Sequence, residues 1–392
     1  MKDFWEEAEP KKVNKKKIII SIIILVLIII GVIIIILYNR NAQIKHWIDK
    51  YILGKEVLQN TSVSIELNTE DTPNIYAFNK YIGILNKNIF KVYNSSAKME
   101  NELNLEITNP LFASSNRFLA VAESKGQKVY LIEDKEIKWE SSIEGNIVQV
   151  HVNKNGYVAV VISDTTYKTV ISVYSTEGKK LFNTYLSNTR TVDISISNDN
   201  KFLAIAEIDT SGTMIQSNIR IVSIDKAQTE SENSMIKRYT GENNNLITNI
   251  KYQDKNRLVC MYTDSIHIIE NDVDSVLSEN KDKKITFTSI GLNNNTVNVE
   301  ERSTGLFTAD SILNITNTNN KNSITYTVSE VTKEIYTYED VVALNLGADV
   351  VFVNTSGWLL KRYIANQEIT NIVLSNSIAG IVYRDKIEII NL

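Results

Sequence analysis

Most of the chain alternates between short apolar runs and polar turns. From about Ser62 to Leu392, runs rich in Val, Ile, Tyr and Phe are separated by turns rich in Asn, Asp, Ser and Gly, with almost no helical periodicity. Short runs of β-branched and aromatic residues between such turns are typical of strands. This part of the chain is therefore predicted to be an all-β domain.

The strand-like runs repeat in a fixed order of turn, apolar strand, turn and strand. The order is clearest where FLAVAE (Phe118 to Glu123), YVAVVIS (Tyr157 to Ser163) and FLAIAE (Phe202 to Glu207) follow the turns SSNR, NKNG and SNDNK. The spacing is about 42 residues per repeat, and a period of about 40 to 45 with four strands per unit is the signature of a β-propeller. Solenoid repeats are shorter, and two sandwich domains would not explain the repeated order. Weaker copies that bring the repeats to eight begin at Tyr81, Leu258, Thr296, Asp340 and Ser377.

Eight four-stranded blades are favoured, and seven blades are the alternative if the irregular stretch from Thr286 to Val331 does not form a complete blade. The last repeat, from Ile369, has room for only three strands before Leu392. A ring of blades leaves open edges unless its ends are joined. We therefore expect the alternating segment from Val63 to Leu67 to supply the missing outer strand of the last blade.

The longest apolar run precedes this domain, from Ile18 to Leu37, and only Ser21 and Gly31 interrupt it. About 20 apolar residues in a helix cross a hydrocarbon layer of about 30 Å, whereas the apolar region of a secretory signal has about 7 to 15 residues. No small-residue cleavage site follows the run. The sequence therefore predicts an uncleaved transmembrane helix at residues 18–37.

Basic residues next to the run predict its orientation. Six lysines lie in the tail at residues 1–17, and the comparable stretch after the run holds only Arg40, Lys45 and Lys50. Because basic flanks resist translocation, the amino terminus is expected in the cytoplasm and the bulk of the chain on the extracytoplasmic side of the cell membrane.

Residues 38–55 are predicted to form a short amphipathic stalk helix that ends near Gly54, and residues 56–392 the propeller. Spacings of three and four residues gather five apolar residues on one face of this helix. The face is expected to pack on its own domain or at the membrane interface, with self-association or docking on a partner as the alternative. The candidate partner-binding residues are Ile44, Trp47, Ile48, Tyr51 and Ile52.

Composition excludes several classes of function. The formal net charge is only −4 and no dense basic patch with aromatics occurs outside the lysines near the apolar run, so nucleic acid is not an expected partner. Cys260 is the only cysteine, which rules out an intramolecular disulfide, and its apolar neighbours indicate a strand core.

No catalytic, cofactor or metal site is predicted. His46, His151 and His267 lie far apart, and we interpret them as ordinary stalk or strand residues. The 14 glycines form no nucleotide-binding loop or nucleophile elbow. Asp193 opens an inner strand, and a turn or solvated position is favoured over one facing the channel. The Asn-rich segment at residues 293–295 is expected to be a solvated hairpin tip.

Two segments resemble known bacterial propeller repeats. SNDNKFLAIAE (Ser197 to Glu207) and ISVYSTEGKKLF (Ile171 to Phe182) are similar to repeats of the TolB-like and YVTN-type propellers, although Asn198 replaces Pro and Asn200 replaces Gly. The Gly-His and Trp-Asp pairs of the WD repeat are absent. As a whole, the chain resembles the uncharacterised single-span propeller proteins of Gram-positive bacteria, a family of unknown function. The resemblance implies an architecture and a location, but no activity.

The sequence thus favours a membrane-anchored extracytoplasmic propeller that acts as a non-catalytic binding or scaffold module for an envelope protein. A receptor or sensor for a glycan or small ligand is one alternative, and an envelope hydrolase or lyase with its site in the channel is another.

Overall fold

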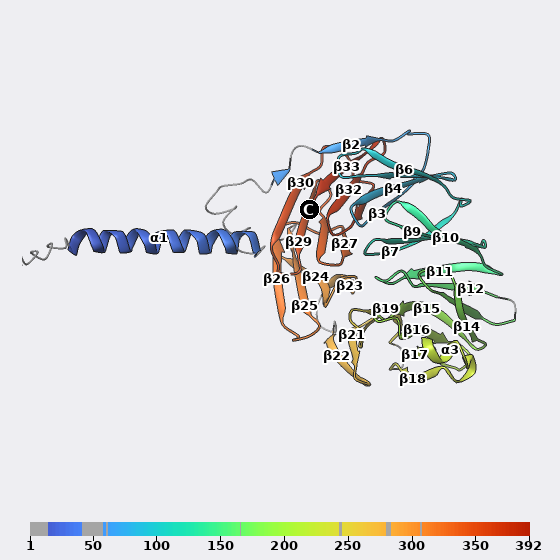
Figure 1. The fold of residues 1–392 in the computed structure, drawn as a ribbon. Helices are drawn as coiled ribbons and strands as arrows, with labels where there is room; N and C mark the ends of the chain where they lie inside the picture. The colour runs from blue at the N-terminus through green and yellow to red at the C-terminus, as the bar shows by residue number, and fades with distance from the viewer. Residues whose placement is uncertain are drawn as a thin grey trace, which may run out of the picture. The chain divides into compact units, whose positions relative to one another are not determined.

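The computed structural model describes residues 15–40, 58–59, 62–164, 166–242, 245–279, 284–305 and 308–392. The chain divides into two compact units, Met1–Val57 and Leu58–Leu392. In the first unit the structure describes one helix, α1 (Lys15–Arg40) (Figure 1). The predicted stalk face from Ile44 to Ile52 lies outside the described residues.

Helix α1 covers the whole apolar run at residues 18–37, so the helix itself is confirmed. Its described apolar side chains, from Ile24 to Leu37, are 39% to 62% exposed. A search of the described residues finds no helix that is both long enough and apolar enough to cross a membrane. The predicted membrane span is therefore not supported by the structure.

The second unit is a propeller of eight sheets, which confirms the all-β fold and the larger of the two expected blade counts (Figure 1). The first four blades follow each other along the chain, and within each blade the four strands are hydrogen-bonded to one another in sequence order. Blade 1 contains β3 (Asn74–Phe78), β4 (Tyr81–Asn86), β5 (Ile89–Tyr93) and β6 (Met99–Asn104). Blade 2 contains β7 (Pro110–Ser115), β8 (Phe118–Glu123), β9 (Lys128–Glu133) and β10 (Glu136–Ser142). Blade 3 contains β11 (Asn146–Val152), β12 (Val158–Ser163), β13 (Thr169–Tyr174) and β14 (Lys180–Leu186). Blade 4 contains β15 (Thr189–Ile196), β16 (Phe202–Asp209), β17 (Gln216–Ser223) and β18 (Met235–Thr240), with α3 (Ile224–Ala227) and the 3-10 turn η2 (Ser231–Asn233) before β18.

The other four blades complete the ring. Blade 5 contains β19 (Ile247–Tyr252), β20 (Arg257–Tyr262), β21 (Ser265–Glu270) and β22 (Val273–Glu279). Blade 6 contains β23 (Ile285–Ser289), β24 (Asn295–Ser303), β25 (Ala309–Asn317) and β26 (Ser323–Val328), so the irregular stretch does form a complete blade. Blade 7 contains β27 (Glu334–Tyr338), β28 (Val341–Asn345), β29 (Asp349–Asn354) and β30 (Leu359–Ile364). Blade 8 contains β31 (Asn371–Leu374), β32 (Ile378–Val382), β33 (Lys386–Asn391) and β2 (Val63–Glu66).

The ring closes as the sequence predicts. Strand β2 pairs antiparallel with β33, with Val63 opposite Ile389 and Ile65 opposite Ile387, and thereby supplies the outer strand of blade 8. A second addition was not predicted: β1 (Leu58–Gln59) pairs parallel with β30 and makes blade 7 five-stranded. Both additions cover sheet edges that would otherwise have unpaired backbone groups.

The turns between the first and second strands explain why the repeat tolerates asparagine. Asn116, Gly156 and Asn200 end the equivalent polar turns, and all three have positive φ angles, of 53°, 81° and 62°. Glycine and asparagine adopt this left-handed conformation more readily than other residues. Asn200 can therefore replace the glycine of related repeats without changing the turn.

Each seam between neighbouring blades holds its own apolar cluster, because the second and third strands of a blade are covered on both faces. The seam between blades 1 and 8 includes Ile65 of the closing strand together with Ile82 and Ile387. The seam between blades 5 and 6 has the smallest fully buried set, which is Val259, Ile266, Ile268 and Ile290. Stability is thus spread around the ring, with one seam that has less apolar packing than the others.

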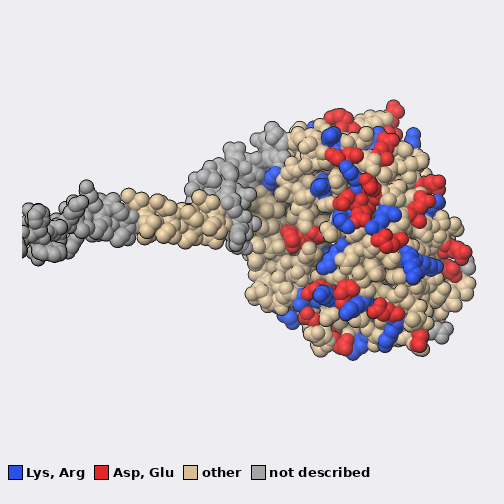
Figure 2. Space-filling model, viewed as in Figure 1, with Lys and Arg blue, Asp and Glu red and all other residues tan. Residues whose placement is uncertain are grey.

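The distribution of surface charge and the burial of Cys260 are as the sequence predicts. On the face that Figure 2 shows, acidic and basic side chains are interspersed and form no large patch of one sign. Cys260 is buried in β20, and burial raises the pKa of its thiol well above the ordinary value. A buried thiol of raised pKa is not a nucleophile at neutral pH.

Candidate functional site

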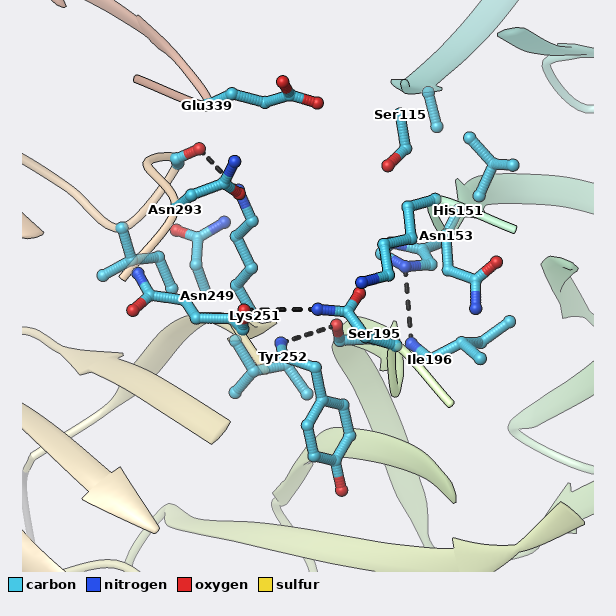
Figure 3. A pocket seen from close by; sticks show the side chains of 18 of the residues that line it. Ser115, His151, Asn153, Ser195, Ile196, Asn249, Lys251, Tyr252, Asn293 and Glu339 are labelled. Carbon is cyan, nitrogen blue, oxygen red and sulfur yellow. Dashed lines mark hydrogen bonds between the residues drawn. The ribbon is translucent and has the colours of Figure 1, made fainter. Parts of the chain in front are cut away.

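A cavity of about 810 Å³ lies where the innermost strands of six blades end. Figure 3 shows Asn249, Lys251, Asn293 and Glu339 on one side of it, and His151 with its neighbours on the other. We call this cavity the channel mouth. Its polar lining residues are Ser114, Ser115, Asn116, His151, Asn153, Lys154, Asp193, Ser195, Asn198, Asn249, Lys251, Gln253, Asp254, Thr288, Ser289, Asn293, Asn294, Thr337 and Glu339.

Asp193 faces the channel mouth, so the preference for a turn or solvated position was wrong. Its carboxylate accepts hydrogen bonds from the backbone N–H groups of Ile194 at 2.9 Å and Ile250 at 2.8 Å, and from the Gln149 amide at 3.0 Å. Burial nevertheless raises the pKa of Asp193 to about 6. Because its oxygens already bind blades 3 and 5, Asp193 holds three blades together rather than offering a free base.

Lys251 is a partly buried cation in the wall of the channel mouth, whereas Lys154 is exposed at the rim. Its Nζ donates a hydrogen bond of 2.5 Å to the backbone carbonyl of Gly291, and no carboxylate in the described part of the chain forms an ion pair with it. Burial lowers the pKa of Lys251 to about 8, against the opposing effect of the Glu339 and Asp340 carboxylates. At neutral pH most molecules therefore keep a desolvated ammonium here, which favours an incoming anionic or strongly polar group.

Two carboxylates, those of Glu339 and Asp340, act on the charge of Lys251; Glu339 is partly buried, whereas Asp340 is exposed. Burial raises the pKa of both groups, and the charge of Lys251 opposes that effect. The amide of Asn376 in blade 8 donates a hydrogen bond to Glu339, so this carboxylate also joins neighbouring blades. The carboxylates of Asp193 and Glu339 are therefore engaged in the structure of the ring, whereas Asp254 is exposed at the rim.

His151 is a strand residue, as predicted, but it also lines the channel mouth. Its Nε2 accepts a hydrogen bond of 3.4 Å from the backbone N–H of Ile196. Burial, assisted by the charge of Lys251, lowers the pKa of His151 to about 4. The imidazole is thus neutral at physiological pH and serves as a hydrogen-bond acceptor.

Side-chain amides tie consecutive blades together around the rim. Asn153 of blade 3 donates to Asn200 at 2.6 Å, and Asn198 of blade 4 donates to the carbonyl of Gln253 at 3.2 Å. Gln253 of blade 5 in turn donates to the carbonyls of Leu292 at 2.9 Å and Asn295 at 2.7 Å. The turns that surround the cavity are consequently fixed to one another and need little ordering when a ligand binds.

The sequence did not identify most of these residues. Asn293 and Asn294 line the channel mouth, and Asn295 is buried, so this segment is not a solvated tip.

His267 is an ordinary strand residue, as expected, with its Nδ1 2.9 Å from Asp274. His46 lies outside the described residues. Groups of acidic, His and Cys side chains able to hold a metal are not found among the described residues. Lys251 lies in a strand without any motif, so only its position in the ring reveals it.

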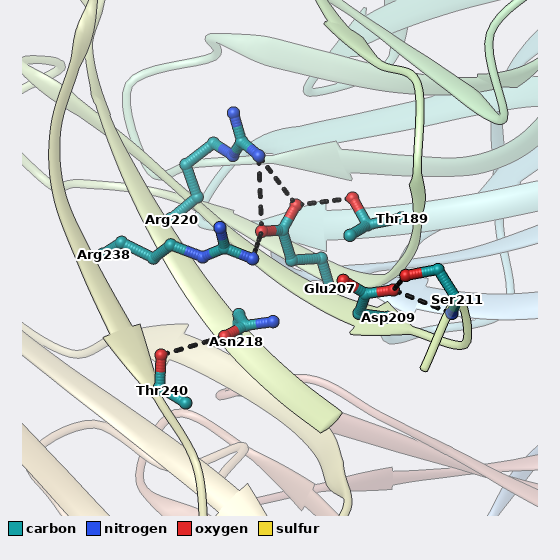
Figure 4. A network of polar contacts seen from close by, with 8 residues as sticks. All are labelled: Thr189, Glu207, Asp209, Ser211, Asn218, Arg220, Arg238 and Thr240. Carbon is teal, nitrogen blue, oxygen red and sulfur yellow. Dashed lines mark hydrogen bonds and ion pairs between the residues drawn. The ribbon is translucent and has the colours of Figure 1, made fainter. Parts of the chain in front are cut away.

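A second polar cluster lies at the opposite end of blade 4 (Figure 4). Glu207 is fully buried, accepts a hydrogen bond of 2.7 Å from Thr189, and lies 3.3 Å from the guanidinium of Arg220 and 3.4 Å from that of Arg238. Both carboxylate oxygens are thereby engaged. This cluster is a structural ion-pair network, and it leaves no open position for a ligand.

The comparisons with known proteins agree with the fold. Residues 55–392 match the model of a family described as "Family of unknown function (DUF5711)", and the chain belongs to that family. No curated protein matches the chain. The family assignment agrees with the expected membership of a family of unknown function, and it gives no activity.

Solved structures share the propeller architecture at very low sequence identity. The C-terminal WD40 domain of Sif2 has a TM-score of 0.54 at 11% identity, and the match covers 85% of this chain and 99% of that one. The dihydro-heme d1 dehydrogenase NirN has a TM-score of 0.51 at 8% identity, with 85% and 73% covered. BamB from Moraxella catarrhalis has a TM-score of 0.47 at 12% identity, with 85% and 99% covered. At these identities the likeness shows the fold alone.

Proposed function

We propose that this member of the family is a non-catalytic binding module, which uses the channel mouth to hold an envelope protein partner. The observation that carries the proposal is the fixed ring of amides and hydroxyls around the desolvated ammonium of Lys251. Such a site suits a polar protein segment that brings a carboxylate to Lys251 and hydrogen-bonding side chains or backbone groups to the rim. Preformed sites of this kind bind with little loss of conformational entropy.

The arrangement of the acidic groups supports binding rather than catalysis. Hydrolases of glycosidic bonds need two free carboxyl groups placed on either side of the bond that is cleaved. Here Asp193 is bound by backbone amides, and Glu339 is bound by Asn376. None of the residues that line the channel mouth is an arginine. With Asp193 and Glu339 engaged in this way, the site does not present the pair of free carboxyl groups that such a hydrolase needs.

We further propose that α1 tethers the propeller to the cell membrane, with the propeller on the extracytoplasmic side. The apolar side chains from Ile24 to Leu37 are largely exposed on the described helix, and exposed apolar surface of this extent favours contact with lipid or protein. The lysines before the apolar run favour a cytoplasmic amino terminus. Tethering would confine the propeller to the membrane surface and raise its effective concentration toward a membrane-bound partner. Protease added to intact cells is expected to digest the propeller; protection until lysis would overturn this location.

Photocrosslinking in intact cells tests the partner. A photoreactive amino acid at Lys154, which is exposed on the rim of the channel mouth, is compared with one at Thr213, which is exposed at the opposite end of blade 4. We expect the Lys154 position to capture a discrete envelope protein that the Thr213 position does not. Adding Lys251→Met should then reduce the capture at least several-fold. Equal capture at both positions, or no protein captured at Lys154, would reject the channel mouth as the docking site.

The predicted stalk face, which lies outside the described residues, is a second place for contact with the same partner. Trp47 is the natural crosslinking position there, since it is the largest side chain of that face. Capture of the same protein from Trp47 and Lys154 would support one partner that binds both surfaces. Capture of lipid alone from Trp47 would limit the docking site to the propeller.

The cavity also favours a second candidate, a receptor for a neutral glycan or a similar small polar ligand. Its volume of about 810 Å³ falls within the range of about 300 to 1,000 Å³ that is usual for small-molecule sites. Amides and hydroxyls are suitable partners for sugar hydroxyl groups. Soluble fragments of envelope glycans should raise the melting temperature of the full chain if this candidate is correct, and the Lys154 crosslink would then capture glycan rather than protein.

A further inference from the structure

The outer edge of each blade is a potential site for adding a strand, and this protein protects nearly all of these edges. Exposed edge strands tend to pair with other chains unless charges, short length or a covering segment prevent it. Blades 1, 2, 4 and 5 use charges, because β6, β10, β18 and β22 each contain at least two charged residues. The edges of these blades are therefore poor templates for a second strand.

The outer edges of blades 3, 7 and 8 are protected in other ways. Another segment covers the edge strand, or the edge strand is very short. Strand β30 contains Lys361 and Arg362 and is covered by β1. Strand β14 is covered by the η2 turn, where the Ser231 hydroxyl donates a hydrogen bond of 2.8 Å to the backbone carbonyl of Asn183. Strand β2 has only four residues, and one of them is Glu66. Seven of the eight described outer strands thus have an identifiable protection.

Strand β26, the outer strand of blade 6, has none of these protections. Its sequence SITYTV contains no charge, proline or glycine, and β-branched and aromatic residues dominate it. Among the described strands it pairs only with β25. Four of its six residues are exposed, including Ile324 at 44%. Figure 2 shows the rim over β26 almost free of charged atoms. An uncharged segment of high β propensity at an open edge is suited to pairing with another strand.

The flanking charges do not protect this edge either. Lys321 belongs to the turn before the strand, where its φ angle is positive. Glu330, beyond the end of the strand, is paired with Arg362 of blade 7 at 2.7 Å. Neither charge lies within the six residues that would meet an added strand. Among the described residues, therefore, neither a charge nor a paired strand protects this edge.

We propose that β26 pairs antiparallel with β26 of a second copy of this chain, so that two propellers join through one continuous eight-stranded sheet. The second copy is favoured over other strands because the sequence of β26 is complementary to itself. Residues opposite each other in an antiparallel pair point to the same face of the sheet, so the two-fold axis must lie between two copies of the same residue. The registers that overlap most of the strand place this axis between the two copies of Thr325 or between the two copies of Tyr326.

Both registers place compatible side chains opposite each other. Ile324, Tyr326 and Val328 share one face and Ser323, Thr325 and Thr327 share the other. Apolar residues therefore meet apolar or aromatic residues, and hydroxyl residues meet hydroxyl residues, which are favourable cross-strand pairs. The outer strand of blade 4 shows the contrast, since its central Lys237 and Arg238 would each meet a like charge. Strand β26 thus offers self-pairing without like-charge repulsion, and no described strand would have to be displaced from its outer edge.

Sedimentation of the full chain in detergent micelles tests this proposal. The natural chain should form dimers whose fraction rises with concentration, and Thr325→Lys should raise the dimer dissociation constant roughly tenfold or more, since the two-fold axis brings two lysines together. Val273→Lys adds the same charge to β22 at a position that is 62% exposed, and it should leave the dimer unchanged. If Thr325→Lys fails to fold by circular dichroism, Thr327→Lys replaces it, because Thr327 lies on the same exposed face.

Cysteine crosslinking separates this pairing from association through the apolar helix α1. Cys260 is buried and does not compete, so Thr325→Cys should give covalent dimers with a short bismaleimide, whereas Ser275→Cys on β22 should not. Monomers of the natural chain at every concentration would overturn the proposal. Dimers that are insensitive to Thr325→Lys and do not crosslink at Thr325→Cys would overturn it too. The result is independent of the partner proposed for the channel mouth.

Discussion

The hydroxyl of Ser375 donates a hydrogen bond of 2.6 Å to the backbone carbonyl of Asn79, although 296 residues separate the two in sequence. This bond joins the last blade to the first on one side of their seam. Pairing of β2 with β33 joins the two ends of the domain again at the outer edge. The ring is thus closed in two places, by the hydrogen bond between Ser375 and Asn79 and by the pairing of β2, from the start of the domain, with the last strand of blade 8.

The closing strand should contribute strongly to stability. Ile65 is only 7% exposed and packs in the seam between blades 1 and 8, whereas Val63 on the same strand is 45% exposed. We expect Ile65→Ala to lower the free energy of unfolding by about 2 kcal/mol or more, because it leaves a cavity in this seam. Val63→Ala should cost less than about 1 kcal/mol. Urea denaturation of both variants checks this, and equal losses would show that β2 is not packed as described.

Loss of Glu207 should be costly for a different reason. Removing its side chain leaves two guanidinium groups, of Arg220 and Arg238, without their shared carboxylate. Breaking a buried ion pair in this way typically costs about 3 to 5 kcal/mol. Glu207→Ala should therefore lower the melting temperature markedly. The matched control is Glu177→Ala, which removes an ion pair with Lys138 at the surface and should change stability by less than about 0.5 kcal/mol. Similar effects of both variants would contradict the structural role given to Glu207.

Gln253 should matter most at the seam that has the least apolar packing. Its amide group bonds to Leu292, Asn295 and Thr318, all in blade 6. Gln253→Ala leaves these buried groups unsatisfied, which we expect to cost about 1 to 3 kcal/mol. Asn256→Ala, in the same turn but exposed, is the control. Hydrogen exchange should show faster opening of blades 5 and 6 in the Gln253 variant, and unchanged exchange there would refute the seam argument.

Lys251 should make stability depend on pH in the alkaline range. Its pKa is about 8 in the folded protein and about 10.5 in an unfolded chain. Between these values the unfolded chain binds more protons, so the cost of burying the ammonium is fully present below about pH 8 and disappears as the pH rises past about 10.5. Lys251→Met removes this cost and should be more stable than the natural chain at pH 7, by up to about 3 kcal/mol.

The measurement is the difference in unfolding free energy between Lys251→Met and the natural chain at pH 7, 8.5 and 10. Taking the difference cancels the titration of groups that both proteins share. We expect the advantage of the variant to shrink steadily over this range. A difference that stays constant with pH would mean that Lys251 titrates normally and that the channel mouth does not desolvate it.

The repeat pattern was sufficient to predict the ring, its eight blades and the strand that closes it. Apolar strands such as Phe118–Glu123 and Phe202–Asp209 are covered on both faces, so their continuous apolar character is visible in the sequence itself. The same reasoning failed for Asp193 and for Asn293. Their side chains occur in ordinary strand and turn contexts, and nothing local distinguishes a residue that faces solvent from one that faces the channel.

The strands of this protein and their order can be predicted from its sequence, because the alternation of apolar and polar residues and the choice of turn residues act over short distances along the chain. Which residues form the channel mouth depends instead on how the blades are arranged in the ring. Its lining comes from six blades and from residues spread between Ala113 and Glu339, and closure of the ring is what brings them together. The desolvation of Lys251 and Asp193, and hence their altered pKa values, follows from that closure and from no feature of their local sequence.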